Sequence, residues 1–316
     1  MSDSQRPFDR AVVRRHRERA AAAWPAHDFL VREVAGRLAE RLDDIRRSFP
    51  LALDLGCHGG ELMQAMAGRG GIERTVACDL SEAMARRAAA TGAAALVADE
   101  EALPFDAGSF DLVASALSLH WVNDLPGALL QIRRALKPDG LFLAALLGGE
   151  TLGGLRAALV EADGEISGGA GPRVSPFADL RDVGGLLQRA GFALPVVDSD
   201  TLEVTYESAL ALMRDLRGMG ESSALAAGRK GFTRRETLLR AAELYAEHFA
   251  GPDGRVSASF QVLYLTAWAP HASQQRPLRP GSAAQRLAEA LETVERPAGD
   301  KVVPTGQAGP PPSGKS

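Results

Sequence analysis

The stretch LALDLGCHGG, residues 51–60, decides how the rest of the chain is interpreted. Its first half is apolar apart from Asp54, as in a buried strand, and its glycine-rich second half leads into a segment of helical composition, ELMQAMA. In an open α/β sheet, such a turn leaves backbone N–H groups and a helix N-terminus facing a ligand. We therefore expect residues 51–60 to form one wall of a binding site.

The composition is that of a globular chain with little excess charge. Of 316 residues, 46% are hydrophobic, and the formal net charge is −4 at pH 7. This balance gives no reason to expect nucleic-acid binding, and no apolar run approaches the roughly 18–20 residues of a membrane-spanning helix. Two cysteines, Cys57 and Cys78, do not support a disulfide framework, and two buried thiols in a cytosolic chain are expected instead.

The N-terminal region favours a bacterial cytoplasmic protein over one of the mitochondrial matrix. It is Arg-rich, as a presequence would be, but Asp3, Asp9 and Glu18 interrupt it. Its basic segment, AVVRRHRERAAAAW, has helical propensity and predicts a solvated surface helix. Apolar residues at helical spacing predict a second helix from Asp28 to Ile45, and we expect residues 1–45 to form an N-terminal helical cap.

Five apolar segments alternate with helical segments between residues 51 and 147. The expected strands begin at residue 51 and continue with residues 75–80, 95–98, 110–117 and 141–147. This alternation predicts parallel βαβ units with right-handed crossovers. Two later segments, 196–206 and 259–269, are expected as an antiparallel edge, with a helical insertion of about residues 207–250 between them. Residues 46–281 would form this domain, and the Pro- and Gly-rich residues 282–316 a disordered tail.

Acidic residues accompany three successive strands and would meet at the carboxyl edge of the sheet. Asp54 precedes the glycine turn, and Asp79 lies 23 residues beyond Gly56, where a carboxylate can accept both hydroxyls of a ribose. Asp99 could accept from the exocyclic amine of an adenine. A row of carboxylates suits a ligand with a cationic end better than a dinucleotide diphosphate, and the G-x-G-x-x-G pattern is missing. The sequence therefore predicts S-adenosylmethionine as cofactor.

Several motifs in order resemble a known family. LALDLGC, ACDLSEAM, VADEEALPF, FDLVASALSLHWVNDLPGAL and ALKPDG are similar to motifs of the class I S-adenosylmethionine-dependent methyltransferases. GGETLGGLRAAL, LMRDLRGMGES and SFQVLYLTAW extend the resemblance to the family of mitochondrial complex I assembly factor 5 and its bacterial relatives, over roughly residues 8–281. The resemblance implies an α/β fold, a seven-stranded Rossmann-like class I methyltransferase sheet with helices on both faces and a helical insertion before the last strand.

The resemblance also implies which residues bind the cofactor. These are Asp54, Gly56, Cys57, His58, Gly60, Asp79, Leu80, Asp99, Glu100 and Leu117. One of them departs from the family, whose turn usually has glycine where His58 stands. If that position requires a positive φ, histidine is tolerated less well there than glycine.

The reaction stays open at this stage. The main interpretation is a methyltransferase-fold enzyme that modifies a protein, an iron–sulfur subunit, and is linked to assembly of NADH:quinone oxidoreductase (complex I). The family implies two alternatives, an arginine hydroxylase of such a subunit and a malonyl-carrier-protein methyltransferase of biotin synthesis. A non-catalytic assembly chaperone is a further alternative, for which the His58 departure is the only sequence hint.

No catalytic base can be assigned, but two side chains are candidates. His120 and Trp121 follow the fourth strand and either face the acceptor or belong to the core. The only H-x-D/E spacing suited to a facial metal triad is His16-Arg17-Glu18, within the predicted surface helix, so no metal site is predicted. The Gly-rich residues 161–177 form either a lid over the acceptor site or a plain connecting loop.

Overall fold

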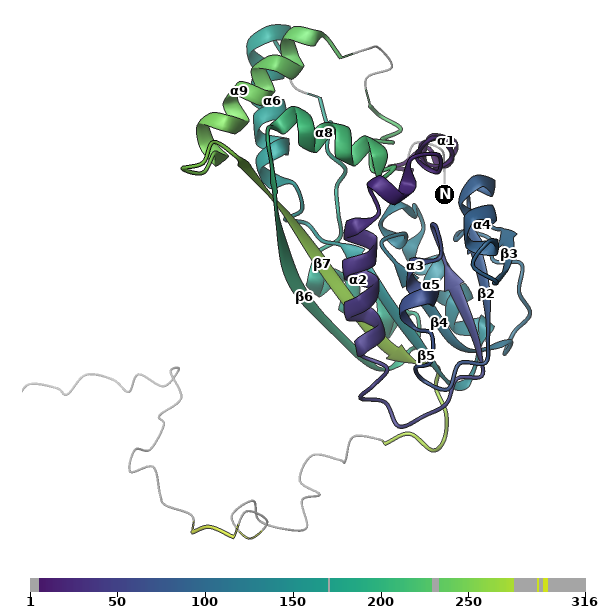
Figure 1. Cartoon of the computed structure of the whole chain (residues 1–316). Helices are drawn as coiled ribbons and strands as arrows, with labels where there is room; N and C mark the ends of the chain where they lie inside the picture. Colours follow the sequence, from purple (N-terminus) through teal and green to yellow (C-terminus); the bar gives the residue numbers. More distant parts are fainter. Residues whose placement is uncertain (1–5, 170, 229–232, 276–288, 290–291, 295–316) are drawn as a thin grey trace, which may run out of the picture. The chain divides into compact units, whose positions relative to one another are not determined.

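A single mixed sheet organises the chain. The computed structural model describes residues 6–169, 171–228, 233–275, 289 and 292–294. The sheet order is β3-β2-β1-β4-β5-β7-β6 (Figure 1). Its strands are β1 (Leu51–Leu55), β2 (Arg74–Asp79), β3 (Ala94–Val97), β4 (Phe110–Ala116), β5 (Leu136–Leu147), β6 (Ala193–Tyr206) and β7 (Val256–Trp268).

Helices connect most of these strands. They are α1 (Arg10–Ala20), α2 (Phe29–Glu40), α3 (Glu61–Ala65), α4 (Glu82–Ala89), α5 (Leu125–Ala135), α6 (Gly153–Ser167), α7 (Leu180–Arg189), α8 (Ala209–Gly218) and α9 (Arg235–Phe249), with 3-10 turns η2 (Trp24–Ala26) and η3 (Leu119–Trp121). The segment between β6 and β7 contains α8 and α9, and α6 packs against α9 (Figure 1).

The strand pairing confirms the predicted fold class. β1 pairs in parallel with β2 and β4, so that Asp54 lies opposite Ala77 on one side and Ala114 on the other. β7 is antiparallel to both β5 and β6. This order, with its antiparallel seventh strand, is that of the class I methyltransferase sheet, and it aligns the carboxyl ends of β1, β2 and β4 at one edge.

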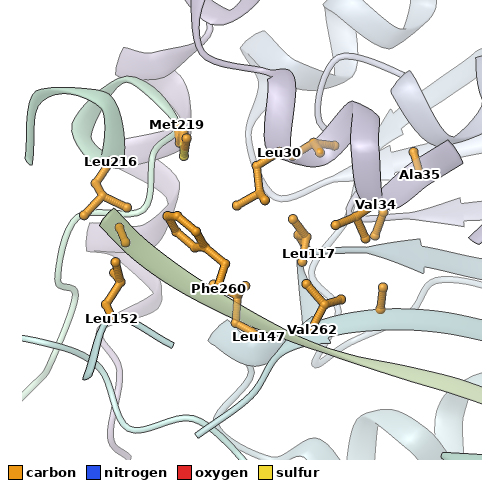
Figure 2. Packing of buried hydrophobic residues seen from close by; sticks show 14 of the residues in the cluster. Leu30, Val34, Ala35, Leu117, Leu147, Leu152, Leu216, Met219, Phe260 and Val262 are labelled. Atoms are coloured by element: carbon orange, nitrogen blue, oxygen red, sulfur yellow. The ribbon is translucent and has the colours of Figure 1, made fainter. Parts of the chain in front are cut away.

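Alternating side chains along the strands fill two cores. In β5, Leu141, Leu143, Ala145 and Leu147 face a core with α2, α6, α8 and α9, whereas Phe142, Ala144 and Leu146 face one with α5 and α7. The period of two in a strand produces this division. Figure 2 shows part of the first core, where Val34 of α2 lies near Leu117 and Phe260 lies near Leu216 and Met219.

Some predicted boundaries differ from the structure. The helix predicted to reach Ile45 ends at Glu40, because Arg41 caps it and a turn follows. α6 continues to Ser167, so the loop predicted at residues 161–177 is shorter than expected. The chain divides into residues 1–272 and 273–316, and most of the predicted tail lies outside the described residues. None of the described helices is long and apolar enough to span a membrane.

Candidate cofactor crevice and acceptor cavity

The glycine turn after β1 is held against β2 and β4. The N–H groups of Gly56 and Cys57 both donate to the carbonyl oxygen of Cys78. Gly56 has a φ of +70°, and a Cβ there would lie 2.0 Å from the Oγ of Ser118. Gly60, at φ +93°, ends the turn directly before α3. Only glycine satisfies both the backbone conformation and the space at residue 56.

His58 occupies this turn with a left-handed backbone. Its φ is +47°, so the position does require the conformation for which histidine is less suited than glycine. Its buried ring stacks on Trp24 with centroids 5.3 Å apart, and Nε2 lies 3.2 and 3.1 Å from the carbonyl oxygens of Ala116 and Leu117. Because carbonyl oxygens only accept, Nε2 carries the proton and donates. These contacts compensate for the backbone strain.

Asp54 is a buried acid without an ionic partner among the described residues. Neither of its carboxyl oxygens receives a hydrogen bond of good geometry from those residues, although the backbone N–H of Met63 is near, and the side chain is fully buried. Burial, and then the nearby carboxylate of Glu61, raise the pKa of Asp54 to about 8 against a smaller opposing effect of the Met63 backbone. Such a group fits a cationic ligand that would pair with it, because pairing would remove the cost of ionising it.

The other predicted acids lie close together, but arginine side chains of α1 already form ion pairs with them. Arg17 Nη1 lies 3.2 Å from Asp79 Oδ2 and 3.2 Å from Glu100 Oε1, and its Nη2 donates to Ser118 Oγ at 2.8 Å. Arg17 is only 2% exposed, and Asp79 and Glu100 are fully buried. Asp79 also accepts from the backbone N–H groups of His58 and Ser81.

A second arginine of α1 completes this arrangement. Arg10 Nη2 pairs with Asp99 Oδ1 at 2.5 Å and also with Glu100, and its Nη1 donates to the carbonyl oxygen of Trp121. Burial alone would raise the pKa of Glu100, but the two guanidinium groups outweigh it and lower that pKa to about 2. We call Asp79, Asp99 and Glu100 with these two arginines the charged crevice; in this structure the arginine side chains of α1 fill it.

The prediction of a solvated surface helix for the basic segment is therefore wrong for one face of α1. Arg10, Val13, Arg17 and Ala20 follow one another at intervals of three or four residues and point to the same side. Val13, Arg17 and Ala20 are buried, whereas Arg14 stays exposed and pairs with Glu18. The signal in the sequence was this spacing, combined with the excess of acids expected at the sheet edge.

The remaining predicted cofactor residues line the same region. Cys57 is buried and its thiol pKa is raised, chiefly by burial. Leu80 packs against the small cluster of Phe8, Val13 and Trp121. Leu117, at φ +50°, presents its carbonyl oxygen to His58. Sequence reasoning missed Ser118 and Glu61, which bond respectively to Arg17 and to the indole N–H of Trp24.

His120 and Trp121 converge on a carboxylate that the sequence did not indicate. Glu221 Oε2 accepts from His120 Nε2 at 3.1 Å and from Trp121 Nε1 at 3.0 Å. Burial opposes ionisation of Glu221, but the neighbouring His120, these two hydrogen bonds and Arg17 together hold its pKa below the usual value. Glu221 lies in the loop after α8, 100 residues from Trp121, so no local pattern connects them.

Trp121 and Glu221 also line a cavity. It encloses about 160 Å³ and is bounded by β5, α6, α8, β7 and the loop before α7. We call it the leucine-lined cavity. Its apolar wall includes Leu147, Leu152, Leu155, Leu159, Leu216 and Phe260. Glu221 interacts electrostatically with Arg17, so the cavity adjoins the charged crevice.

The residues of the H-x-E motif point in different directions. His16 Nδ1 lies 3.1 Å from the carbonyl oxygen of Ser222, Arg17 enters the charged crevice, and Glu18 accepts from the backbone N–H of Glu82. In the part of the chain that the structure describes, no group of three or more His, Cys, Asp and Glu side chains is placed to hold a metal ion.

Comparisons with known proteins agree with this geometry. A family model described as a methyltransferase domain matches residues 53–144. The chain is 45% identical over 280 residues to "Arginine-hydroxylase NDUFAF5, mitochondrial" of Danio rerio, a match that covers 87% of each chain. It is 36% identical over 276 residues to "Malonyl-[acyl-carrier protein] O-methyltransferase" of Methylovorus sp. (strain MP688), covering 84% of this chain and 90% of that protein.

A solved structure supports the fold independently. The crystal structure of the YcgJ protein of Bacillus subtilis superimposes with a TM-score of 0.54 at 15% identity, over 76% of this chain and 99% of that one. The strand order of the sheet and the family match together define a class I S-adenosylmethionine-dependent methyltransferase domain. The chain is an enzyme of this fold. Within this class, the resemblance predicted from the motifs is confirmed: the chain belongs to the family of arginine-hydroxylase NDUFAF5, to which the malonyl-carrier-protein methyltransferases are also related.

Proposed function

We propose that this chain is an arginine hydroxylase that acts on an iron–sulfur subunit of NADH:quinone oxidoreductase in a bacterial cytoplasm. The supporting observation is which charged group at the leucine-lined cavity remains available to a ligand. Arg173 and Glu221 both line it, but Arg173 is paired through two hydrogen bonds with buried Asp163, whereas Glu221 is held ionised. The available charge is therefore a carboxylate, which suits a guanidinium and disfavours the carboxylate of a malonyl group.

The sequence matches favour the same acceptor. Identity is 45% with the arginine hydroxylase and 36% with the malonyl-carrier-protein methyltransferase, at similar coverage. The motifs alone suggested a protein methyltransferase as the main interpretation. These identities favour an arginine hydroxylase instead. Hydroxylation of a C–H bond by dioxygen takes up two electrons and two protons and releases water. The proposal therefore includes dioxygen and a two-electron reductant as co-reactants.

We also propose that S-adenosylmethionine binds in the charged crevice; its sulfonium carries a transferable methyl group, which hydroxylation would not consume. Asp54 would pair with its ammonium, Asp79 would accept from the ribose hydroxyls, and Asp99 would accept from the adenine amine. The buried carboxyl of Asp54 fits such a ligand, because its charge has no ionic partner among the described residues. Because Arg10 and Arg17 pair with the same acids, α1, within the predicted cap of residues 1–45, would have to release them.

Mass spectrometry of the iron–sulfur subunits tests the proposed reaction. Subunits from a strain that lacks this chain are expected to lose the mass of one oxygen atom on an arginine-containing peptide, and a plasmid copy of the gene should restore it. Loss of a methylene mass instead would indicate methylation. Unmodified subunits that merely fail to assemble would indicate the chaperone alternative, and either result would contradict hydroxylation.

A further inference from the structure

The leucine-lined cavity combines a narrow apolar interior with one available carboxylate oxygen. Its volume of about 160 Å³ is below the roughly 300–1,000 Å³ of pockets that enclose drug-sized ligands. Leu152, Leu216 and Phe260 lie near one another across it (Figure 2). These dimensions suit one long side chain rather than a nucleotide or a pantetheine-linked group.

The two charged groups at the cavity differ in what they can still bind. Arg173 donates from Nε and Nη2 to the carboxylate of Asp163 and from Nη1 to Thr233 Oγ1. Asp163 is fully buried beneath it. Every nitrogen of that guanidinium therefore has a partner, and its charge is balanced, so a carboxylate ligand would gain little from it.

Only one of the two carboxyl oxygens of Glu221 accepts hydrogen bonds from the described residues. Its Oε2 receives both hydrogen bonds, from His120 and Trp121, and none of the described residues donates to its Oε1. The carboxylate is anchored by these two donors, whose side chains are themselves buried. An anchored, ionised carboxylate with one unpaired oxygen at an apolar cavity is a receptor for a cationic group on an apolar stem.

We propose that the leucine-lined cavity binds the side chain of an acceptor arginine, with its methylene stem among Leu152, Leu216 and Phe260 and its guanidinium on Glu221 Oε1. This assignment rests on the proposed function for the identity of the acceptor. It makes Glu221 the residue that selects a cationic acceptor over a neutral or anionic one. Because Glu221 also adjoins Arg17, the arginine would be held next to the charged crevice.

Peptide binding to the full-length protein tests this assignment. The probes are acetyl-Gly-Ala-Arg-Ala-Gly-amide and the same peptide with citrulline, which keeps the shape of arginine without its charge. Binding is followed by NMR on the indole N–H signal of Trp121, which donates to Glu221. The wild type is expected to prefer the arginine peptide at least about tenfold, because a charged hydrogen bond replaces a neutral one.

The Glu221→Gln variant should lose this preference. Glutamine keeps the size and the carbonyl acceptor for Trp121, so the ratio of the two dissociation constants is expected to fall close to one. Glu165→Gln is the matched control, because Glu165 pairs with Arg240 on the surface and does not line the cavity. An unchanged ratio in Glu221→Gln, a ratio near one in the wild type, or no binding of either peptide would overturn the assignment.

Two results separate this inference from the proposed function. If no arginine of the iron–sulfur subunits is modified but the peptide preference depends on Glu221, the hydroxylase proposal fails and the cavity assignment stands. If a strain carrying Glu221→Gln, at wild-type protein levels, modifies the arginine as fully as the wild type does, the hydroxylase proposal stands and the cavity assignment fails.

Discussion

Replacing Arg17 with methionine is expected to destabilise the ligand-free protein and, at the same time, to tighten its binding of S-adenosylmethionine. The variant keeps most of the apolar stem but removes the charge that balances Asp79 and Glu100, both fully buried. Removing one partner of a buried ion pair typically costs about 3–5 kcal/mol of stability. Thermal and denaturant unfolding of the ligand-free variant measure this loss.

The gain in affinity follows from competition between Arg17 and the cofactor. In the wild type, the proposed cofactor would have to displace the guanidinium from the carboxylate expected to bind the ribose, and this would reduce its apparent affinity. Without Arg17 the dissociation constant should fall at least about tenfold, as measured by calorimetry. Arg14→Met is the control, because Arg14 lies on the exposed face of the same helix.

A weaker affinity in Arg17→Met would contradict this account, because it would mean that Arg17 contacts the bound cofactor. Should that variant not fold, Arg10→Ala makes the same test more mildly. Arg10 is less deeply buried and pairs with Asp99 and Glu100. Its removal should also tighten binding, with a smaller loss of stability.

Replacing Asp54 with asparagine is expected to flatten the pH dependence of stability between about pH 4 and 8. The folded-state pKa of about 8 lies above the unfolded value of 3.8, so the folded protein holds a proton there that the unfolded chain has released. The stability of the wild type therefore falls as pH rises through this range. Each unit of pKa corresponds to about 1.4 kcal/mol, so the effect amounts to several kcal/mol.

The measurement compares unfolding free energies of wild type and Asp54→Asn from pH 4 to pH 8. The difference should shift steadily in favour of the variant as pH rises, whatever its value at pH 4. The variant should also bind S-adenosylmethionine more weakly, because the ammonium loses its carboxylate. Parallel pH profiles would show that Asp54 is not held protonated in the folded state.

Sequence patterns predicted the fold and the convergence of the acids because both follow from short-range rules. Strand periods, turn residues and the order of βαβ units place Asp54, Asp79 and Asp99 at one edge of the sheet before any coordinate is known. The prediction that residue 58 could need a positive φ depended only on its place in a glycine turn. The structure gives His58 that backbone.

What the sequence did not predict depends on tertiary contacts. Arginines in a helix of mixed charge usually remain solvated, and only the docking of α1 buries Arg17 against acids 62 and 83 residues away. Glu221 lies in a loop without helix or strand periodicity, and its role becomes visible only where Trp121 and His120 meet it. Helical spacing can mark the face of α1 that becomes buried, but it does not show which distant acids that face will meet.

Calorimetric titration with S-adenosylmethionine of wild type, Asp79→Ala and Asp111→Ala tests the charged crevice most directly. Asp111 provides a matched control, because it pairs with Lys137 at the opposite edge of the sheet. We predict binding by wild type and Asp111→Ala, and a loss of at least about tenfold in Asp79→Ala, because two hydroxyl donors lose a charged acceptor. An affinity of Asp79→Ala equal to that of the wild type would contradict the assignment of this crevice to the cofactor.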